Sequence, residues 1–169
     1  MESRAKIFGH PIHQMLIVFP LGVLAMALVF DLIARFAGWP ELHRAAYYMI
    51  AAGVISGLAA AVFGLIDFLA IPRETRARRI GALHGTGNVI VVALFGLSWF
   101  LRRDDPVNPE VLAIALAAAG ALLATVTGWL GGELVDRLGV GIDDGAHLDA
   151  PSSLSGPVPA GSASTRTRA

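Results

Sequence analysis

Five ionisable side chains stand at the borders of long apolar stretches, where a charged group is costly. They are His10, His13, Asp67, His84 and Glu133. Imidazole and carboxylate groups are ligands of divalent transition metals, and two imidazoles from different helices are the minimum set for haem b held without a covalent link. We therefore expect His13 and His84 to be cofactor ligands, with His10, Asp67 and Glu133 completing a metal site.

The residues around His13 predict the start of a helix. Pro11 is typical of the first helical position, which places His10 at or near the N-cap and His13 one turn further on. The positive end of the helix dipole favours a neutral, ligand-competent imidazole at His13, and also at His84 if that residue begins a helix. Two neutral imidazoles at the same end of two helices indicate a binding site for a proton, a metal ion or a cofactor.

The two carboxylates also have simpler interpretations. Asp67 and Glu133 are expected at the negative ends of their helices, where a carboxylate needs a proton or a cation. Arg73 and Arg76 follow Asp67 within one or two turns, and Arg137 follows Glu133 at the i,i+4 spacing. Ordinary ion pairs would therefore also explain both acidic side chains.

The histidines have structural alternatives as well. His10 could act only as a helix cap. His13 and His84 could hydrogen-bond to a carboxylate and so fix the register of the helices, without binding any ligand. We expect His43 and His147 to be solvated residues of a loop and a tail.

The composition indicates that lipid is the solvent of this chain. Of its 169 residues, 55% are hydrophobic and 15% are charged, and its mean hydropathy is +0.64, whereas soluble domains carry roughly 25% charged residues. The 13 basic and 13 acidic side chains give a net charge of zero, which gives no indication of a nucleic-acid partner. The absence of cysteine excludes thiolate metal sites, iron–sulfur clusters and covalently attached haem.

The apolar residues are concentrated in segments of the length that spans a bilayer, about 20 residues. None of the segments has the polar stripe of a soluble helix, and we therefore predict an all-α, up-down-up-down integral membrane four-helix bundle within residues 1–142. Near the end of the first segment, Asp31 and Arg35 have the i,i+4 spacing of an ion pair. The predicted helices are 14–36, 45–71, 84–101 and 111–130.

The distribution of basic residues predicts that both termini are cytoplasmic. Arg4, Lys6, Arg73, Arg76, Arg78, Arg79 and Arg137 lie on one side of the predicted spans, and Arg35, Arg44, Arg102 and Arg103 lie on the other. The first segment is too long for the core of a signal peptide and is expected to be retained. Residues 143–169, rich in Ser, Pro, Ala, Gly and Thr, are predicted to be a disordered cytoplasmic tail.

The sequence also contains a weak internal repeat. Each half begins with a histidine at an expected helix start, crosses the membrane, and returns through a glycine-rich helix. Gly64-Leu65-Ile66-Asp67 in the first half corresponds to the segment from Gly128 to Glu133 in the second. Because both halves begin on the same side, they would be related by a pseudo-twofold axis along the membrane normal.

Several short motifs are distributed over residues 7 to 142. They are Gly9-His10-Pro11-Ile12-His13, Phe19-Pro20-Leu21-Gly22, Gly64-Leu65-Ile66-Asp67-Phe68, Ala82-Leu83-His84-Gly85 and Gly128-Trp129-Leu130-Gly131-Gly132-Glu133. Together they resemble a family of bacterial membrane proteins called domain of unknown function 2231. The family pattern has a second proline where this chain has Gln14 and a further histidine where it has Val18. The resemblance implies a four-helix fold in the inner membrane of a bacterium, but no settled activity.

Two functional hypotheses follow from these residues. In the first, His13 and His84 bind haem b or a divalent metal ion, and the protein transfers electrons to a redox or membrane-complex partner. In the second, the polar residues only tie the helices together in a structural or accessory subunit without a cofactor or catalysis. Proton or ion translocation is less favoured because no polar chain crosses the central span, and a homo-oligomer is left open.

Overall fold

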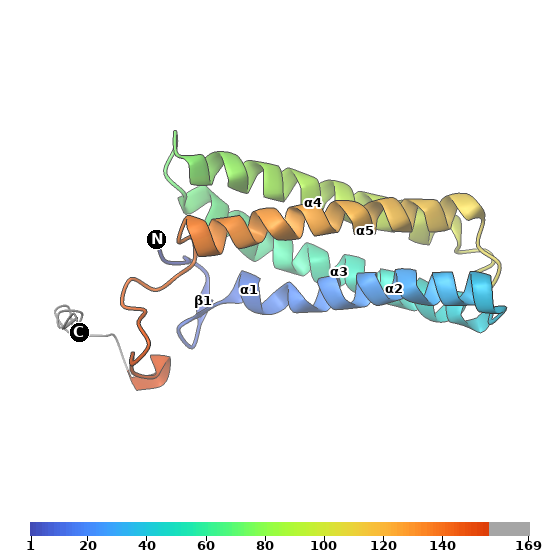
Figure 1. Cartoon of the computed structure of the whole chain (residues 1–169), viewed down its shortest axis with the longest axis horizontal. Helices are drawn as coiled ribbons and strands as arrows, with labels where there is room; N and C mark the ends of the chain where they lie inside the picture. Colours follow the sequence, from blue (N-terminus) through green and yellow to red (C-terminus); the bar gives the residue numbers. More distant parts are fainter. Residues whose placement is uncertain (156–169) are drawn as a thin grey trace, which may run out of the picture.

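In the computed structural model, which describes residues 1–155, the long helices run side by side in alternating directions (Figure 1). Four helical spans in this part of the chain are long and apolar enough to cross a membrane, which confirms the predicted four-helix bundle. The short helix α1 continues into α2, and a π-helical turn, η1, extends α5. The helices are α1 (Ile12–Leu16), α2 (Val18–Ala37), α3 (Glu41–Ala70), α4 (Arg76–Leu101), α5 (Val111–Gly132) and η1 (Glu133–Arg137).

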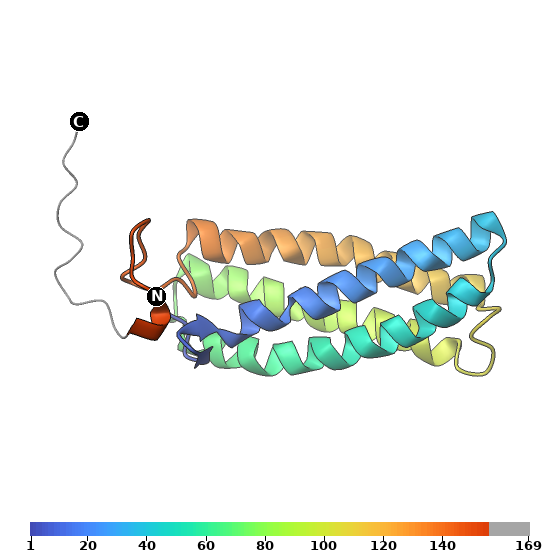
Figure 2. The same cartoon turned by 90° about the horizontal axis from the view of Figure 1, so that it is seen from below.

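Alanines fill much of the bundle interior together with a few large side chains such as Ile50 and Phe95, and many other large apolar side chains face outward. Ala27, Ala46, Ala113 and Ala117 are completely buried, whereas many Leu, Val, Ile and Phe side chains on every long helix are exposed to the surroundings. In a membrane, small residues between helices allow close backbone approach, and the exposed apolar side chains meet lipid. Figures 1 and 2 show the slender four-helix shape that results.

Two of the glycines that allow close approach of neighbouring helices lie against large apolar side chains. A Cβ atom on Gly53 would lie 2.4 Å from a side-chain carbon of Leu24, and one on Gly120 would lie 2.9 Å from the ring of Phe95. The first contact joins α2 to α3, and the second joins α4 to α5 in the same way. Each half of the chain therefore packs its helix pair by seating a large side chain on a glycine.

Three of the four spans begin earlier than the sequence alone suggested, and the fourth begins at Val111 as predicted. The third span starts at Arg76 rather than at His84, because the Thr75 side chain caps it by accepting a hydrogen bond from the Arg78 amide at 3.1 Å. His84 therefore lies well inside α4, beyond the first turn to which the helix dipole is confined, so the dipole argument does not apply to it. The second span likewise starts at Glu41 instead of Ala45.

The N-terminal segment and residues 138–155 lie together at one end of the bundle (Figure 2). Strands β1 (Lys6–Ile7) and β2 (His10–Pro11), which the sequence did not suggest, form a small antiparallel hairpin before α1. The Met1 ammonium group donates to the Gly139 carbonyl, and the Gly141 amide donates to the Met1 carbonyl, both at 2.9 Å. Within the segment predicted to be a disordered tail, Asp143 and Ser153 contact Lys6 and His10 of the N-terminal hairpin; residues 156–169 of this segment lie outside the described residues.

Candidate cofactor site in the bundle

His13 of α1 and His84 of α4 lie next to each other inside the bundle. Their ring centroids are 6.3 Å apart, and the ring planes are at 89°. Both side chains are half-buried, and their helices come from different halves of the chain. The structure thus brings together the two residues expected to be cofactor ligands.

Each of these imidazoles is oriented by a main-chain carbonyl group. The Nδ1 atom of His13 lies 2.9 Å from the Ala60 carbonyl oxygen, and that of His84 lies 2.8 Å from the Thr127 carbonyl oxygen. A carbonyl group only accepts, so Nδ1 carries the hydrogen in each ring, and the neutral imidazole has its lone pair on Nε2. Metal-binding histidines are typically oriented by such a hydrogen bond from the other ring nitrogen.

Glycine makes room for both rings. A Cβ atom on Gly64 would lie 2.8 Å from Cε1 of His13, and one on Gly131 would lie 3.1 Å from Cε1 of His84. Each glycine follows, by one helical turn, the residue whose carbonyl binds that imidazole. The repeat suggested by the sequence therefore has a structural counterpart, with Gly131 rather than Gly128 in the position that corresponds to Gly64.

Asn88 makes the surroundings of His84 differ from those of His13. Its Nδ2 atom donates to the His84 carbonyl at 2.9 Å and lies 3.3 Å from Nε2 of the same residue. Its Oδ1 atom accepts a hydrogen bond from the Thr127 hydroxyl at 3.1 Å. Asn88 was not among the expected site residues, although an amide one turn after His84 in an apolar segment is a detectable signal.

Asp67 is directed towards the N-terminal segment and not towards the histidine pair. Its carboxylate accepts hydrogen bonds from the Ser3 hydroxyl at 2.8 Å, the Arg4 amide at 2.7 Å and the Ala5 amide at 3.3 Å. These donors replace the arginine partners expected from local spacing. Asp67 thereby fastens residues 3–5 across the end of α3.

Glu133 and His10 also lie outside the histidine pair's hydrogen-bond network. Glu133 forms an ion pair with Arg76 at 2.6 Å, and not the one expected with Arg137. His10 is exposed on the hairpin, where its Nε2 atom lies 3.3 Å from the Ser153 hydroxyl. Among residues 1–155, no group of three or more His, Asp or Glu side chains is arranged to hold a metal ion. A ligand of His13 and His84 would therefore have no third side-chain ligand of these types.

A second polar cluster lies near the other end of the bundle. Asp31 pairs with Arg102, and its Oδ1 atom also lies 2.8 Å from Nδ1 of His43. The Arg102 guanidinium further donates to the Ser98 hydroxyl at 3.0 Å. The ion pair expected between Asp31 and Arg35 is therefore wrong, as is the solvated position expected for His43, which is buried.

Two imidazoles are a donor set of the type that binds haem iron or a divalent metal ion. Their ring centroids lie 6.3 Å apart, and among residues 1–155 no further His, Asp or Glu side chains join them in a metal-binding group. The Nε2 lone pairs of His13 and His84 are the atoms that would hold such a group. With two protein ligands, a bare ion would keep further coordination positions for water or another ligand.

Membrane-spanning helices around an internal histidine pair define an integral membrane protein. Residues 9–144 match the family model described as "Predicted membrane protein (DUF2231)", and the chain belongs to this family. No match was found among curated proteins, and none among solved structures. Val18, which stands where the family pattern has a histidine, is 61% exposed, so that position faces away from the pair formed by His13 and His84.

Proposed function

We propose that this membrane protein uses His13 and His84 to bind a redox cofactor, either haem b or a single divalent metal ion, and that it transfers electrons. One observation carries the proposal: two imidazoles whose ring centroids lie 6.3 Å apart both donate Nδ1–H to main-chain carbonyls, so the lone pair of each ring is on Nε2. Haem iron or a redox-active ion, when bound, would supply one-electron exchange. The chain's own residues hold and orient the ligand atoms.

The charge distribution supports a cytoplasmic location for this end of the bundle, in the inner membrane of a bacterium. The short connections and termini near the histidine pair carry most of the basic residues. At the opposite end, Arg102 is buried in an ion pair with Asp31, so fewer free cations remain there. With this orientation, a soluble or membrane-bound redox partner would approach from the cytoplasmic side.

A structural or accessory role is the second candidate, and it rests on the hydrogen bonds that the two histidines already make between helices. Through Nδ1, His13 already links α1 to α3, and His84 links α4 to α5. Asp67 and Glu133 have protein partners of their own. In this role the imidazoles would hold the helices in register, and Nε2 would bind nothing.

Asparagine variants separate the two candidates. In His13→Asn and His84→Asn, the amide nitrogen is attached to the same carbon as Nδ1 and can still donate to the carbonyl of Ala60 or Thr127. These variants lack Nε2. Wild-type protein purified from its native membrane should show a Soret band or a stoichiometric metal ion, and both Asn variants should lose it while remaining folded, with the thermal stability of cofactor-free wild-type protein in detergent.

His147→Asn, which changes an exposed histidine, is the matched control and should retain the cofactor. Wild-type protein with neither a Soret band nor a stoichiometric metal would overturn the cofactor proposal. The accessory role would then be supported if His13→Ala and His84→Ala lowered the thermal stability and the Asn variants did not.

A further inference from the structure

The tip of the N-terminal hairpin carries an aromatic residue in an unusual backbone conformation. Phe8 and Gly9 form the two-residue turn between β1 and β2, with φ angles of 50° and 83°. Such turns favour Asn-Gly or Asp-Gly, because a bulky side chain is strained at positive φ. Phe8 is nevertheless 75% exposed, so packing against the protein does not explain it.

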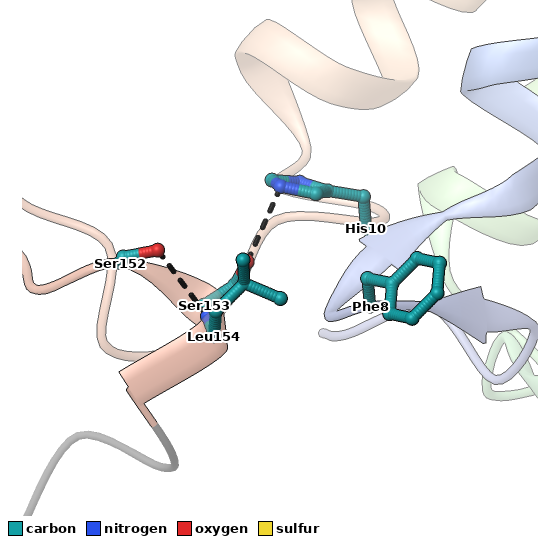
Figure 3. Close-up of a pocket in the computed structure, with 5 residues that line it drawn as sticks. All are labelled: Phe8, His10, Ser152, Ser153 and Leu154. Carbon is teal, nitrogen blue, oxygen red and sulfur yellow. Dashed lines mark hydrogen bonds between the residues drawn. The ribbon is translucent and has the colours of Figure 1, made fainter.

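A second exposed apolar side chain lies beside Phe8. Leu154, in the short helix η2 (Ser153–Ser155), is 77% exposed. Figure 3 shows Phe8 and Leu154 flanking a shallow cleft, with His10 and Ser153 joined by a hydrogen bond next to them. The cleft has a volume of about 360 Å³. Two segments from opposite ends of the chain therefore present apolar side chains at one place.

The position of the hairpin explains why apolar side chains are exposed at its tip. It immediately precedes α1, and Figure 1 shows it beside the bundle, at about the level where α4 begins and α5 ends. Met15 and Phe19 in the first span and Ile7 and Phe8 in the hairpin are all exposed apolar side chains, and the only exposed polar side chain of the hairpin, His10, already contacts the Ser153 hydroxyl. The hairpin thus carries exposed apolar side chains at the end of the lipid-facing bundle, where the membrane–water boundary is expected.

We propose that Phe8 and Leu154 anchor this hairpin in the interfacial region of the bilayer, with lipid covering the cleft between them. An apolar ring gains most when it reaches the boundary between headgroups and acyl chains. Lys6, the only basic side chain of the hairpin strands, is already bound by Glu2 at 2.6 Å and by Asp143 at 3.4 Å, so the contact of the hairpin tip rests on its apolar side chains. The anchor fastens the C-terminal segment to the membrane surface through the contact between Ser153 and His10.

Single-cysteine labelling tests the anchor directly, because the chain contains no cysteine. The variants Phe8→Cys and Leu154→Cys are labelled with an environment-sensitive fluorophore in full-length protein reconstituted into phosphatidylcholine vesicles. Ala150→Cys, exposed at the same end, and Asp104→Cys, exposed in the loop between α4 and α5, are the matched controls. Quenching is compared for a lipid-attached nitroxide at headgroup depth and for aqueous iodide.

At positions 8 and 154 we expect blue-shifted emission and several-fold stronger quenching by the lipid nitroxide than at the controls, with no dependence on added phosphatidylglycerol. Strong iodide quenching at position 8, equal to that at position 150, would show that the hairpin projects into water and would overturn the anchor. Shielding from both quenchers would also overturn it, because protein would then cover the tip. These outcomes do not depend on whether His13 and His84 bind a cofactor.

Discussion

The carboxylate of Asp31 and the guanidinium of Arg102 form an ion pair that is completely buried between α2 and α4. The Nη1 atom of Arg102 lies 2.9 Å and 3.0 Å from the two carboxylate oxygens, and both side chains have no exposed surface. A charge inside a membrane-spanning bundle is tolerated when it is paired and hydrogen-bonded. This pair, with His43 and Ser98, holds three helices together at the end opposite the histidine pair.

Removal of one member of this pair should destabilise the bundle strongly. Asp31→Ala leaves the Arg102 charge buried without compensation, and loss of one partner of such a pair costs about 3–5 kcal/mol. The free energy of unfolding in detergent, measured by denaturant titration, provides the test. Glu41→Ala removes an exposed ion pair with Arg44 and is the matched control, with an effect below about 1 kcal/mol.

The double variant Asp31→Leu/Arg102→Met replaces both charges by apolar side chains and should recover much of the lost stability. Equal effects of Asp31→Ala and Glu41→Ala would contradict a buried, paired charge.

The sequence predicted the four spans well because hydrophobicity and length decide them locally. It could not identify the partner of Asp31, because the choice depends on which side of the helix faces the interior. Asp31 shares an interior face with Leu24, Ala27 and Ala34, whereas Arg35 is exposed. The helical spacing of Asp31 from these buried residues was the signal available in the sequence, because it predicts that Asp31 faces inward and Arg35 faces outward.

The candidate site was predicted in part for a similar reason. His13 and His84 meet because both lie near the same end of spans that enter from one side. Asp67 and Glu133 have different partners, because the N-terminal segment folds over α3 and α4 begins early enough to present Arg76. Neither event leaves a local pattern in the sequence, since both depend on how distant segments pack.

Alanine at Gly64 should disturb His13 while alanine at Gly22 should not. The added Cβ at position 64 would lie 2.8 Å from the imidazole, whereas position 22 has no atom within 4 Å. Overpacking of this kind costs about 1–3 kcal/mol, and Gly64→Ala should lower the thermal midpoint in detergent. Gly22→Ala should leave it unchanged or raise it, because alanine favours helix more than glycine does.

The second half of the chain provides an independent pair for this comparison. Gly131→Ala should act through His84, at 3.1 Å, and Gly132→Ala, with open space around it, is its control. If the control variants were as destabilised as Gly64→Ala and Gly131→Ala, loss of helix flexibility would explain the effect better than contact with the rings.

Acidification should release the C-terminal segment from the N-terminus. The hydrogen bond from Lys6 lowers the pKa of Glu2 below its ordinary value of 4.5, and the Gly145 amide and Lys6 lower the pKa of Asp143 below 3.8. Contributions from lowered carboxyl pKa values are present above the ordinary values and are lost as the pH falls through the lowered ones. The Asp144 amide, which donates to Glu2, should therefore lose exchange protection between about pH 5 and about pH 2.

At alkaline pH, the contribution of Lys6 to stability changes with pH in the opposite direction. Its pKa is raised above 10.5 by Glu2, so its contribution is complete below that value and is lost as the pH rises through the raised pKa. Glu2→Gln removes the carboxylate and should weaken the acid dependence of Asp144 protection. An unchanged acid dependence in Glu2→Gln would show that this contact does not hold the segment.

Asp67→Ala should free residues 3–5 without affecting the histidine pair. The Arg4 and Ala5 amides lose their acceptor, and hydrogen bonds to a charged group contribute about 1.5–3 kcal/mol each, so their exchange protection should fall about tenfold or more. Asp136→Ala, an exposed acidic position at the same end, is the control and should leave both amides protected.

Any haem or metal bound by wild-type protein should remain at full stoichiometry in Asp67→Ala, because this carboxylate is directed at Ser3 and the backbone of the N-terminal segment. The opposite pattern, loss of the cofactor with protected amides, would instead identify Asp67 as a ligand.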